Sequence, residues 1–252
     1  MALLLSIPAI VVPSLPAASQ VASTLLNPLV AAWIKSEIGE VENLKVQIAG
    51  SDQQILQGLI PEAQVSGDNL SYQGFQVSRI ALDGQNIQLN VGQALQGQAL
   101  RLIAPVPVAV RMLLSQADLN QTLQADLVRE QLAQAQVSLP IGGTEVPFLI
   151  SDPNVTLEPG QLRIQANLTT PEGATVPVTL TTGLTVQNQN QLLLVNPTWI
   201  SEGQALPIPG LNNLAIQLDP DVNVQKLELQ QGQILYEGSL TIQPEELAAT
   251  AG

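Results

Sequence analysis

Hydrophobic and polar residues alternate along much of this chain, which predicts β-strands that each bury one face. The pattern is clearest in residues 74–91, where the pair Asp83-Gly84 interrupts it. Because Asp-Gly is a frequent hairpin turn, we expect an antiparallel hairpin with its turn at this pair. The apolar positions of its second half are Ile87, Leu89 and Val91.

Further strands are expected from the same alternation in both halves of the chain. They lie in residues 44–48, 59–65, 155–168, 176–186, 192–195 and 214–242. A hairpin turn is expected at residues 158–161, which read Glu-Pro-Gly-Gln. Pro105 and Pro107 lie within the apolar stretch 102–114 and predict a sheet edge or an extended lead-in there.

Two segments instead show apolar residues at spacings of three and four, which predicts long amphipathic helices over residues 21–40 and 116–136. The second begins at Ser115 and Asp118, the spacing of a capping box. Each helix precedes a run of strands, so we expect an α+β fold in which an antiparallel sheet packs on two long amphipathic helices.

No change in composition separates two domains, so residues 21–243 are expected to form a single domain. Residues 1–20 form an apolar tail or a weak signal segment, because residues 2–12 resemble a signal-peptide core but no Lys or Arg precedes Lys35. Pro8 and Pro13 interrupt this run, which is too short to span a bilayer. Residues 244–252 are expected to be a frayed polar tail.

The charge balance limits the classes of partner. The chain has 21 acidic and 8 basic residues and a net charge of −13, so nucleic acid is not an expected partner. The same balance argues against permanent docking on strongly anionic membranes and leaves contact with neutral lipid open. Aromatic residues make up only 2%, so the core is aliphatic. Such a lining suits hydrocarbon, although a plain aliphatic core is the commoner explanation.

Candidate chemistry is sparse. The chain has no His and no Cys, and it contains no G-x-S-x-G, G-x-G-x-x-G or P-loop motif. Asp219, Asp221 and Asn223 resemble the start of a calcium loop, but Val224 and Gln230 occupy the positions that require Gly and Glu. A turn between strands explains them better. We therefore expect no catalysis, no cofactor and no metal site.

Several segments resemble a known family, the LmeA-like phospholipid-binding proteins, also called DUF2993. The resemblance covers residues 25–123 and is carried by the leading helix and by residues 50–58, 72–74, 86–90 and 117–120. It implies a fold similar to the tubular lipid-binding (TULIP, BPI-like) proteins, in which a strongly curved antiparallel sheet wraps around long helices and leaves an apolar groove. It also implies phospholipid as the ligand.

From the pattern and the resemblance together we expect non-enzymatic binding or transfer of phospholipid in this groove, with transient membrane contact. A cell-envelope location is slightly favoured over a cytoplasmic one. The alternatives are a scaffold protein whose groove is filled by side chains and an enzyme acting on lipid-linked sugars. The expected lipid-binding residues are Leu26, Leu29, Val30 and Trp33 of the first helix, Ile87, Leu89 and Val91 of the facing strand, and Leu119, Leu123 and Leu127 of the second helix.

Overall fold

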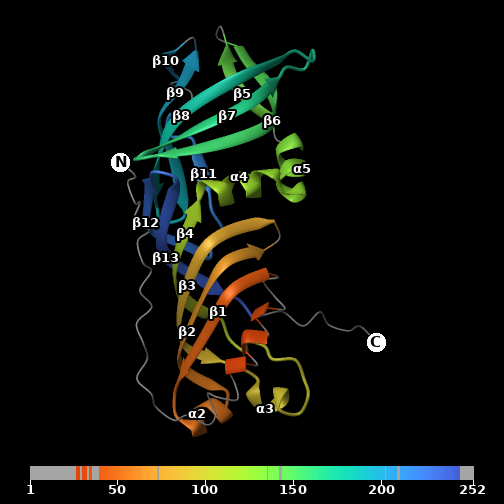
Figure 1. The fold of residues 1–252 in the computed structure, drawn as a ribbon, viewed down its shortest axis with the longest axis vertical. Coiled ribbons are helices and arrows are strands. Elements are labelled where there is room, and N and C mark those ends of the chain that lie inside the picture. Colours follow the sequence, from red (N-terminus) through yellow and green to blue (C-terminus); the bar gives the residue numbers. More distant parts are fainter. Residues whose placement is uncertain are drawn as a thin grey trace, which may run out of the picture.

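Antiparallel strands make up most of the protein and form two sheets along its long axis (Figure 1). The computed structural model describes residues 27–28, 30–32, 34–35, 40–72, 74–134, 136–141, 144–201, 203–208 and 211–244. In this part of the chain no helix is long and apolar enough to cross a membrane. The expected tails, residues 1–20 and most of 244–252, lie outside the described residues.

The sheet at the lower end of Figure 1, called the lower sheet, has strongly bent strands in the order β1-β2-β3-β4-β13-β12. These are β1 (Glu40–Ala49), β2 (Leu59–Tyr72), β3 (Phe75–Gln88), β4 (Val106–Ser115), β13 (Gln233–Ile242) and β12 (Val222–Gln230). All neighbouring strands are antiparallel. The first and last strands of the chain's sheet region thus share one sheet, because β13 returns to pair with β4.

The other sheet, called the upper sheet, has the order β10-β9-β8-β7-β6-β5, and β11 also pairs with β9. Its strands are β5 (Gln136–Ile141), β6 (Thr144–Glu158), β7 (Gln161–Thr169), β8 (Thr175–Gln187), β9 (Gln191–Ser201), β10 (Gln204–Pro207) and β11 (Ala215–Gln217). The expected hairpin turn at residues 158–161 is present, because Glu158 pairs with Gln161 where β6 turns into β7.

The helices are short. Helices α2 (Asp52–Leu56) and α3 (Val91–Ala94) lie at the lower end of the molecule, and α4 (Gln116–Gln124) and α5 (Asp126–Gln134) lie beside the junction of the sheets (Figure 1). The expected α+β fold, with a curved sheet wrapped around two long amphipathic helices as in TULIP or BPI-like proteins, is therefore wrong. The protein is mostly antiparallel β-sheet.

The helix expected over residues 116–136 is split at Ala125, whose ψ of 140° is extended and ends α4. Its start is as expected, because Ser115 and Asp118 form a capping box. The split has a tertiary cause: the Thr122 hydroxyl accepts a hydrogen bond from the Gln76 amide (2.9 Å) and fixes α4 against β3.

The helix expected over residues 21–40 is described only in part. Residues 27–28, 30–32 and 34–35 are helical, and β1 begins at Glu40. Val30 is only 7% exposed and packs, with Ile34, into the hydrophobic cluster of the lower sheet. The expected binding residues Leu26, Leu29 and Trp33 lie outside the described residues.

The turn expected at Asp83-Gly84 is wrong, because β3 continues through both residues. Asp83 is held in the sheet by an ion pair with Arg111 on β4 (2.8 Å). Gly84 is buried, and a Cβ added there would lie 3.1 Å from Ile87 Cδ1, so the small residue makes room for a neighbouring side chain. The hairpin turn lies at the other end of β3, where Tyr72 of β2 pairs with Phe75.

Of the two positions expected for the prolines, the sheet edge is wrong for β4 as a whole, because β4 pairs with both β3 and β13, whereas Pro105 precedes the strand, which begins at Val106. Its pairing with β3 ends at Val108, so Pro107 lies just beyond the shared part. There Pro107 faces only Thr241 of β13. A residue without an N–H is tolerated where one side of the strand has no partner.

Hydrogen bonds and packing join the two sheets. The Asn120 side chain of α4 accepts from the Val155 amide (2.7 Å) and donates to the Val155 carbonyl (2.8 Å), so it pairs with β6 as a strand would. The Gly232 amide donates to the carbonyl of Leu157 (3.0 Å). Leu157 itself is fully buried in a cluster that includes Leu162 of the upper sheet and Ile234 of the lower sheet. The junction is therefore a packed core.

Candidate functional site

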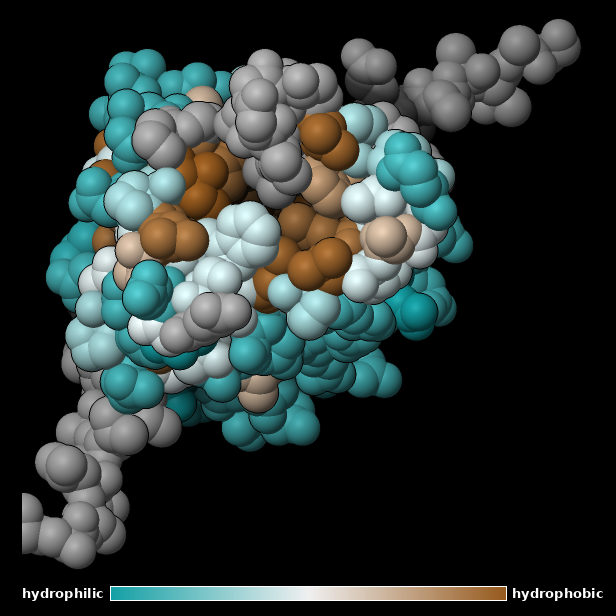
Figure 2. All heavy atoms as spheres, turned by 90° about the horizontal axis from the view of Figure 1, so that it is seen from above, coloured by the Kyte–Doolittle hydropathy of each residue, from teal (hydrophilic) through white to brown (hydrophobic). Residues whose placement is uncertain are grey.

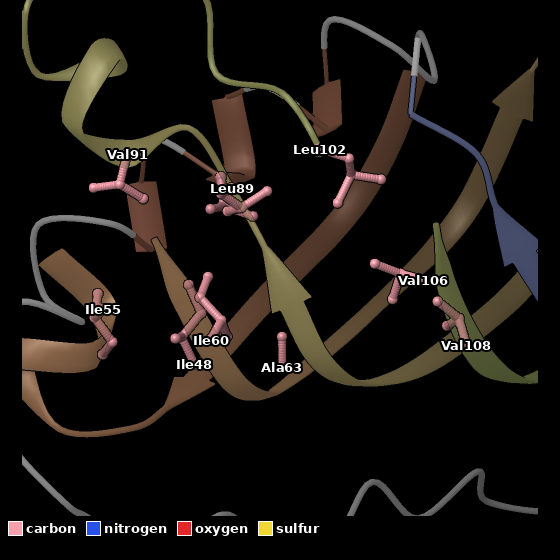
Figure 3. Close-up of a cluster of buried hydrophobic side chains, with 10 residues drawn as sticks. Ile48, Ile55, Ile60, Ala63, Leu89, Val91, Leu102, Val106 and Val108 are labelled. Atoms are coloured by element: carbon pink, nitrogen blue, oxygen red, sulfur yellow. The ribbon is translucent and has the colours of Figure 1, made fainter. Parts of the chain in front are cut away.

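A cluster of aliphatic side chains fills the bend of the lower sheet (Figure 3). Its buried members are Val30, Ile48, Ile55, Ile60, Ala63, Leu89, Val91, Leu102, Val106 and Val108. They come from strands, from α2, from the segment around α3 and, for Val30, from the helical residues that precede β1. Alternation in β4 turns Val106 and Val108 to the same face, and α2 and α3 close the lower end.

A pocket of about 610 Å³ lies beside this cluster, at the α3 end. Its apolar lining is formed by Leu89, Val91, Leu102 and Ile103, which are continuous with the cluster behind them. The remaining lining residues are Gln57, Asn90, Gly92, Gln93, Arg101 and Pro244. The volume falls in the range of small-molecule sites, which are mostly apolar with a few polar groups.

The chain around α3 is held in place by Asn90. Its side chain donates to the Ala99 carbonyl (2.8 Å) and accepts from the Arg101 amide (2.8 Å). The residues on either side also pair: Leu89 forms a β-bridge with Leu102, and the Ile103 amide donates to the carbonyl of Gln88 (2.9 Å). The segment from α3 to Leu102 is therefore a closed loop tied at its base, which fixes the pocket wall.

Arg101 is the charged residue among those that line the pocket. Its guanidinium Nη2 lies 3.4 Å from Gln93 Oε1, so a neutral amide orients the cation. Residues 84–117 contain no Asp or Glu, although the whole chain has 21 of them. The pocket therefore combines an aliphatic floor with one positive charge. Glu245 and Glu246, which follow Pro244, lie outside the described residues.

The upper sheet carries a second apolar surface. Its pairing register places Ile164, Leu180 and Trp199 side by side on one face, and polar residues such as Arg163, Thr181 and Thr198 on the other. Ala166 and Val178 extend the apolar face and, like these three, are only half-buried. Figure 2 views the molecule from this end and shows hydrophobic side chains around a hollow, with hydrophilic residues outside.

In the described part of the chain no group of three or more His, Cys, Asp or Glu side chains is placed to hold an ion. The expected calcium-like segment is a turn into β12: the Asp221 amide donates to Asp219 Oδ1 (2.9 Å). Asp221 also accepts from Gln243 (3.2 Å).

Comparison with known proteins assigns the chain to a family. The model of LmeA-like phospholipid-binding proteins matches residues 17–251. The chain belongs to this family. No curated protein and no solved structure gave a match. The match extends through the upper sheet, well beyond residues 25–123, where the resemblance was recognised from the sequence.

The structure separates the expected binding residues of this LmeA-like protein into two places. Val30, Ile87, Leu89 and Val91 come together at the lower end, where Leu89 and Val91 line the pocket and Ile87 packs against the cluster. Leu119 packs with Leu157 at the junction instead. Two others lie nearby on α4 and α5: Leu123 is half-buried and Leu127 is 56% exposed.

Sequence reasoning missed the residues that give the pocket its polarity and its rim. Asn90 lies in the expected hairpin 74–91, and Leu102 and Ile103 lie in the apolar stretch 102–114, but neither these residues nor Arg101 were expected to bind a ligand. The signal that points to them is the absence of acidic residues from 84–117, in a chain where acids outnumber bases by 21 to 8. An arginine placed between leucines in such a stretch marks a cation beside an apolar surface.

Proposed function

We propose that this protein binds phospholipid non-covalently in the pocket at the α3 end and releases it without chemical change, as binding or transfer requires. The observation that supports it best is the pairing of an aliphatic floor, Leu89, Val91 and Leu102, with the guanidinium of Arg101 at the same pocket. A phospholipid has the matching parts, an acyl chain and a phosphate. Membership of a phospholipid-binding family supports the same ligand class.

The energetics are compatible with reversible binding. Each CH₂ removed from water contributes about 0.8 kcal/mol, so burial of eight methylenes gives roughly 6 kcal/mol before ordering costs. A charge-assisted hydrogen bond from Arg101 to a phosphate oxygen adds directional recognition, because the guanidinium fork matches that group. Partial insertion of one chain therefore provides useful affinity. Val30 belongs to the same buried cluster as the pocket lining, and Ile87 packs against that cluster.

A scaffold function with a filled interior is the second candidate. It is favoured by the tight packing of the lower cluster, where Ile55 is fully buried and Ile60 and Val91 are each 1% exposed. A chain that keeps the fold but fills its interior needs no ligand. The two candidates differ in one measurable property, the presence of bound lipid.

The first experiment is lipid extraction and native mass spectrometry of the protein purified from its own cells. Phospholipid should be bound, and the purified protein should also bind a short-chain phosphatidylcholine in solution. Arg101→Gln should weaken that binding by about tenfold, because one charge-assisted hydrogen bond is lost. The matched control is Arg129→Gln on α5, an exposed arginine outside the pocket, which should bind like the wild type.

Absence of lipid from the purified protein, together with no binding of the short-chain lipid, would exclude the proposed function and favour the scaffold. Equal binding by both arginine variants, with lipid still present, would place the ligand elsewhere. The half-buried face of the upper sheet, with Leu180 and Trp199, is then the next surface to test.

A further inference from the structure

The lower end of the molecule carries exposed hydrophobic side chains as well as the pocket. Leu56 at the end of α2 is 52% exposed, Leu95 just after α3 is 60% exposed, and Ile103 at the pocket rim is 58% exposed. Helices α2 and α3 lie side by side at this end (Figure 1). We call Leu56, Leu95 and Ile103 together the apolar tip.

The backbone holds these side chains firmly in place. Ser51 and Gln54 form a capping box at the start of α2, and Ile55 is fully buried beneath it, so Leu56 is directed away from the core. The amide of Leu95 donates to the Val91 carbonyl (2.9 Å), which completes the turn of α3 above the buried Val91. The exposure of the apolar tip therefore follows from ordered helices.

The charge at this end differs from that of the whole chain. Two of the three tip residues lie within residues 84–117, the segment without acidic residues, and its two charged residues are Arg101 and Arg111. The side chains beside the tip on α2 and α3 are mostly amides, for example Gln53, Gln57 and Gln93, and the acidic exception is Asp52 at the start of α2. A surface of mostly uncharged amides, with Asp52 and Arg101 as its charges, is close to neutral and suits zwitterionic headgroups, whereas the acidic remainder of the chain is repelled by anionic lipid.

From this placement we propose that the apolar tip docks on the surface of a phospholipid bilayer, with Leu56 and Leu95 inserted among the headgroups and the pocket mouth facing the membrane. The proposal rests on the proposed function for the identity of the pocket ligand. It adds the surface through which the protein would take up this ligand from a membrane. Because Ile103 belongs to both the tip and the pocket, the inserted surface and the binding site are continuous.

A bilayer fits the tip better than a protein partner does. A stable protein interface buries about 800 Å² on each side and is enriched in Tyr, Trp and Arg at its centre. The tip offers three aliphatic side chains on two short helices, without an aromatic anchor. Insertion of a few aliphatic side chains into the interface of a bilayer gives weak and reversible attachment, as a lipid-exchanging protein needs.

The test is flotation with two kinds of vesicle, phosphatidylcholine alone and an equal mixture with phosphatidylglycerol. The wild type should float with both. Leu56→Gln combined with Leu95→Gln should weaken vesicle binding by about tenfold or more, because two inserted side chains are lost. The matched control is Leu214→Gln combined with Ile216→Gln, which are 48% and 45% exposed beside the upper sheet and should bind like the wild type.

Neither tip substitution touches the pocket lining, so the tip variant should still bind short-chain phosphatidylcholine in solution. Wild-type protein that binds the short-chain lipid but no vesicles would overturn docking and leave the proposed function standing. Vesicle binding that depends on Leu56 and Leu95, without any bound or short-chain lipid, would retain docking and remove the proposed function. Equal losses in the tip and control variants would also overturn docking. Circular dichroism of each variant verifies that it is folded.

Discussion

Gly58 is the residue on which α2 and the pocket wall both depend. Its φ of +87° lies in the region that favours glycine, and a Cβ there would overlap the carbonyl oxygen of Leu89. The Gly58 carbonyl in turn accepts the amide of Leu89 (2.8 Å). This close contact between two backbones lets β2 start directly below the pocket.

Gly58→Ala should therefore lower the free energy of unfolding by about 3 kcal/mol, since it adds both steric overlap and an unfavourable φ. The measurement is urea denaturation. Gly92→Ala is the matched control, because nothing lies within 4 Å of a Cβ at that α3 position and alanine favours a helix. If the two variants had equal stability, the close contact at Gly58 would be refuted.

Tyr236 provides a pH-dependent prediction. Burial raises the pKa of the Tyr236 hydroxyl above its usual value of 10.0, because the phenolate is poorly solvated there. The folded state thus holds this proton more tightly than the unfolded state, so stability should fall as pH rises above about 10. In the Tyr72→Phe variant only Tyr236 remains, and its tyrosinate absorbance should appear above the usual range; titration at or below pH 10 would contradict the burial.

The residues around Asp83-Gly84 also show why the turn predicted there was wrong. Locally this pair favours a turn, but Arg111 and Ile87 supply partners that keep it in a strand. Ile87 is a neighbour on the same strand, whereas Arg111 lies on β4, 28 residues away, and is brought to Asp83 only by tertiary structure. The alternation around the pair correctly predicted extended structure. Whether the chain turns or continues at Asp83-Gly84 depends on contacts with other strands, which a local pattern does not contain.

Among the elements, α4 connects the two sheets, as its contacts on both sides show. On one side Thr122 accepts from the Gln76 amide of β3, and the Ser78 hydroxyl donates to Asp118. On the other side Asn120 pairs with Val155 of β6. Since β4 leads directly into α4 at Ser115, the helix continues the central strand of the lower sheet into the junction.

Asn120→Ala removes both hydrogen bonds to Val155 and should cost about 1–2 kcal/mol of stability, because two backbone groups of β6 lose their partners. Hydrogen exchange of the Val155 amide should accelerate more than that of other amides in β6. Gln121→Ala, an exposed neighbour on the same helix, is the control and should change neither quantity. Unchanged exchange at Val155 in the Asn120 variant would exclude the bridging role.

The start of α4 was predictable, but its length was not. The capping box at Ser115 is a local signal and is confirmed. The interruption at Ala125 depends on contacts with β3 and β6, which the spacing of Leu119, Leu123 and Leu127 does not reveal. Amphipathic spacing continues across the break, so the pattern predicted one helix where tertiary contacts produce two.

For the whole molecule, the junction of the sheets decides whether the protein unfolds in one step. Leu157 is fully buried there between residues of both sheets. Leu157→Ala should therefore lower stability by about 3 kcal/mol and should weaken both sheets together. Leu206→Ala in the upper sheet, where the side chain is 47% exposed, should cost much less.

Hydrogen exchange resolved by strand provides the measurement. In Leu157→Ala, protection should fall in the lower and the upper sheet to a similar degree. Loss of protection in the upper sheet alone would mean that the two sheets unfold independently.

At this scale the sequence predicted the antiparallel strands, and two of the residues that it singled out lie at the candidate pocket. Alternation identified most strands, and it placed Leu89 and Val91 among the binding residues, where they line a pocket. It did not predict two sheets, because alternation shows which face a strand buries and not which strand lies beside it. The long return of β13 to β4 is an example, since these strands are more than 100 residues apart.

The aliphatic character of the lining has a consequence for which lipids the protein would bind if the proposed function holds. Leucine, valine and isoleucine have no directional groups, so the floor formed by Leu89, Val91 and Leu102 treats a long chain, a short chain and an unsaturated chain much alike. Recognition would be confined to the phosphate end, at Arg101. The bound population should therefore mirror the acyl composition of the host membrane and shift with growth temperature as that composition shifts.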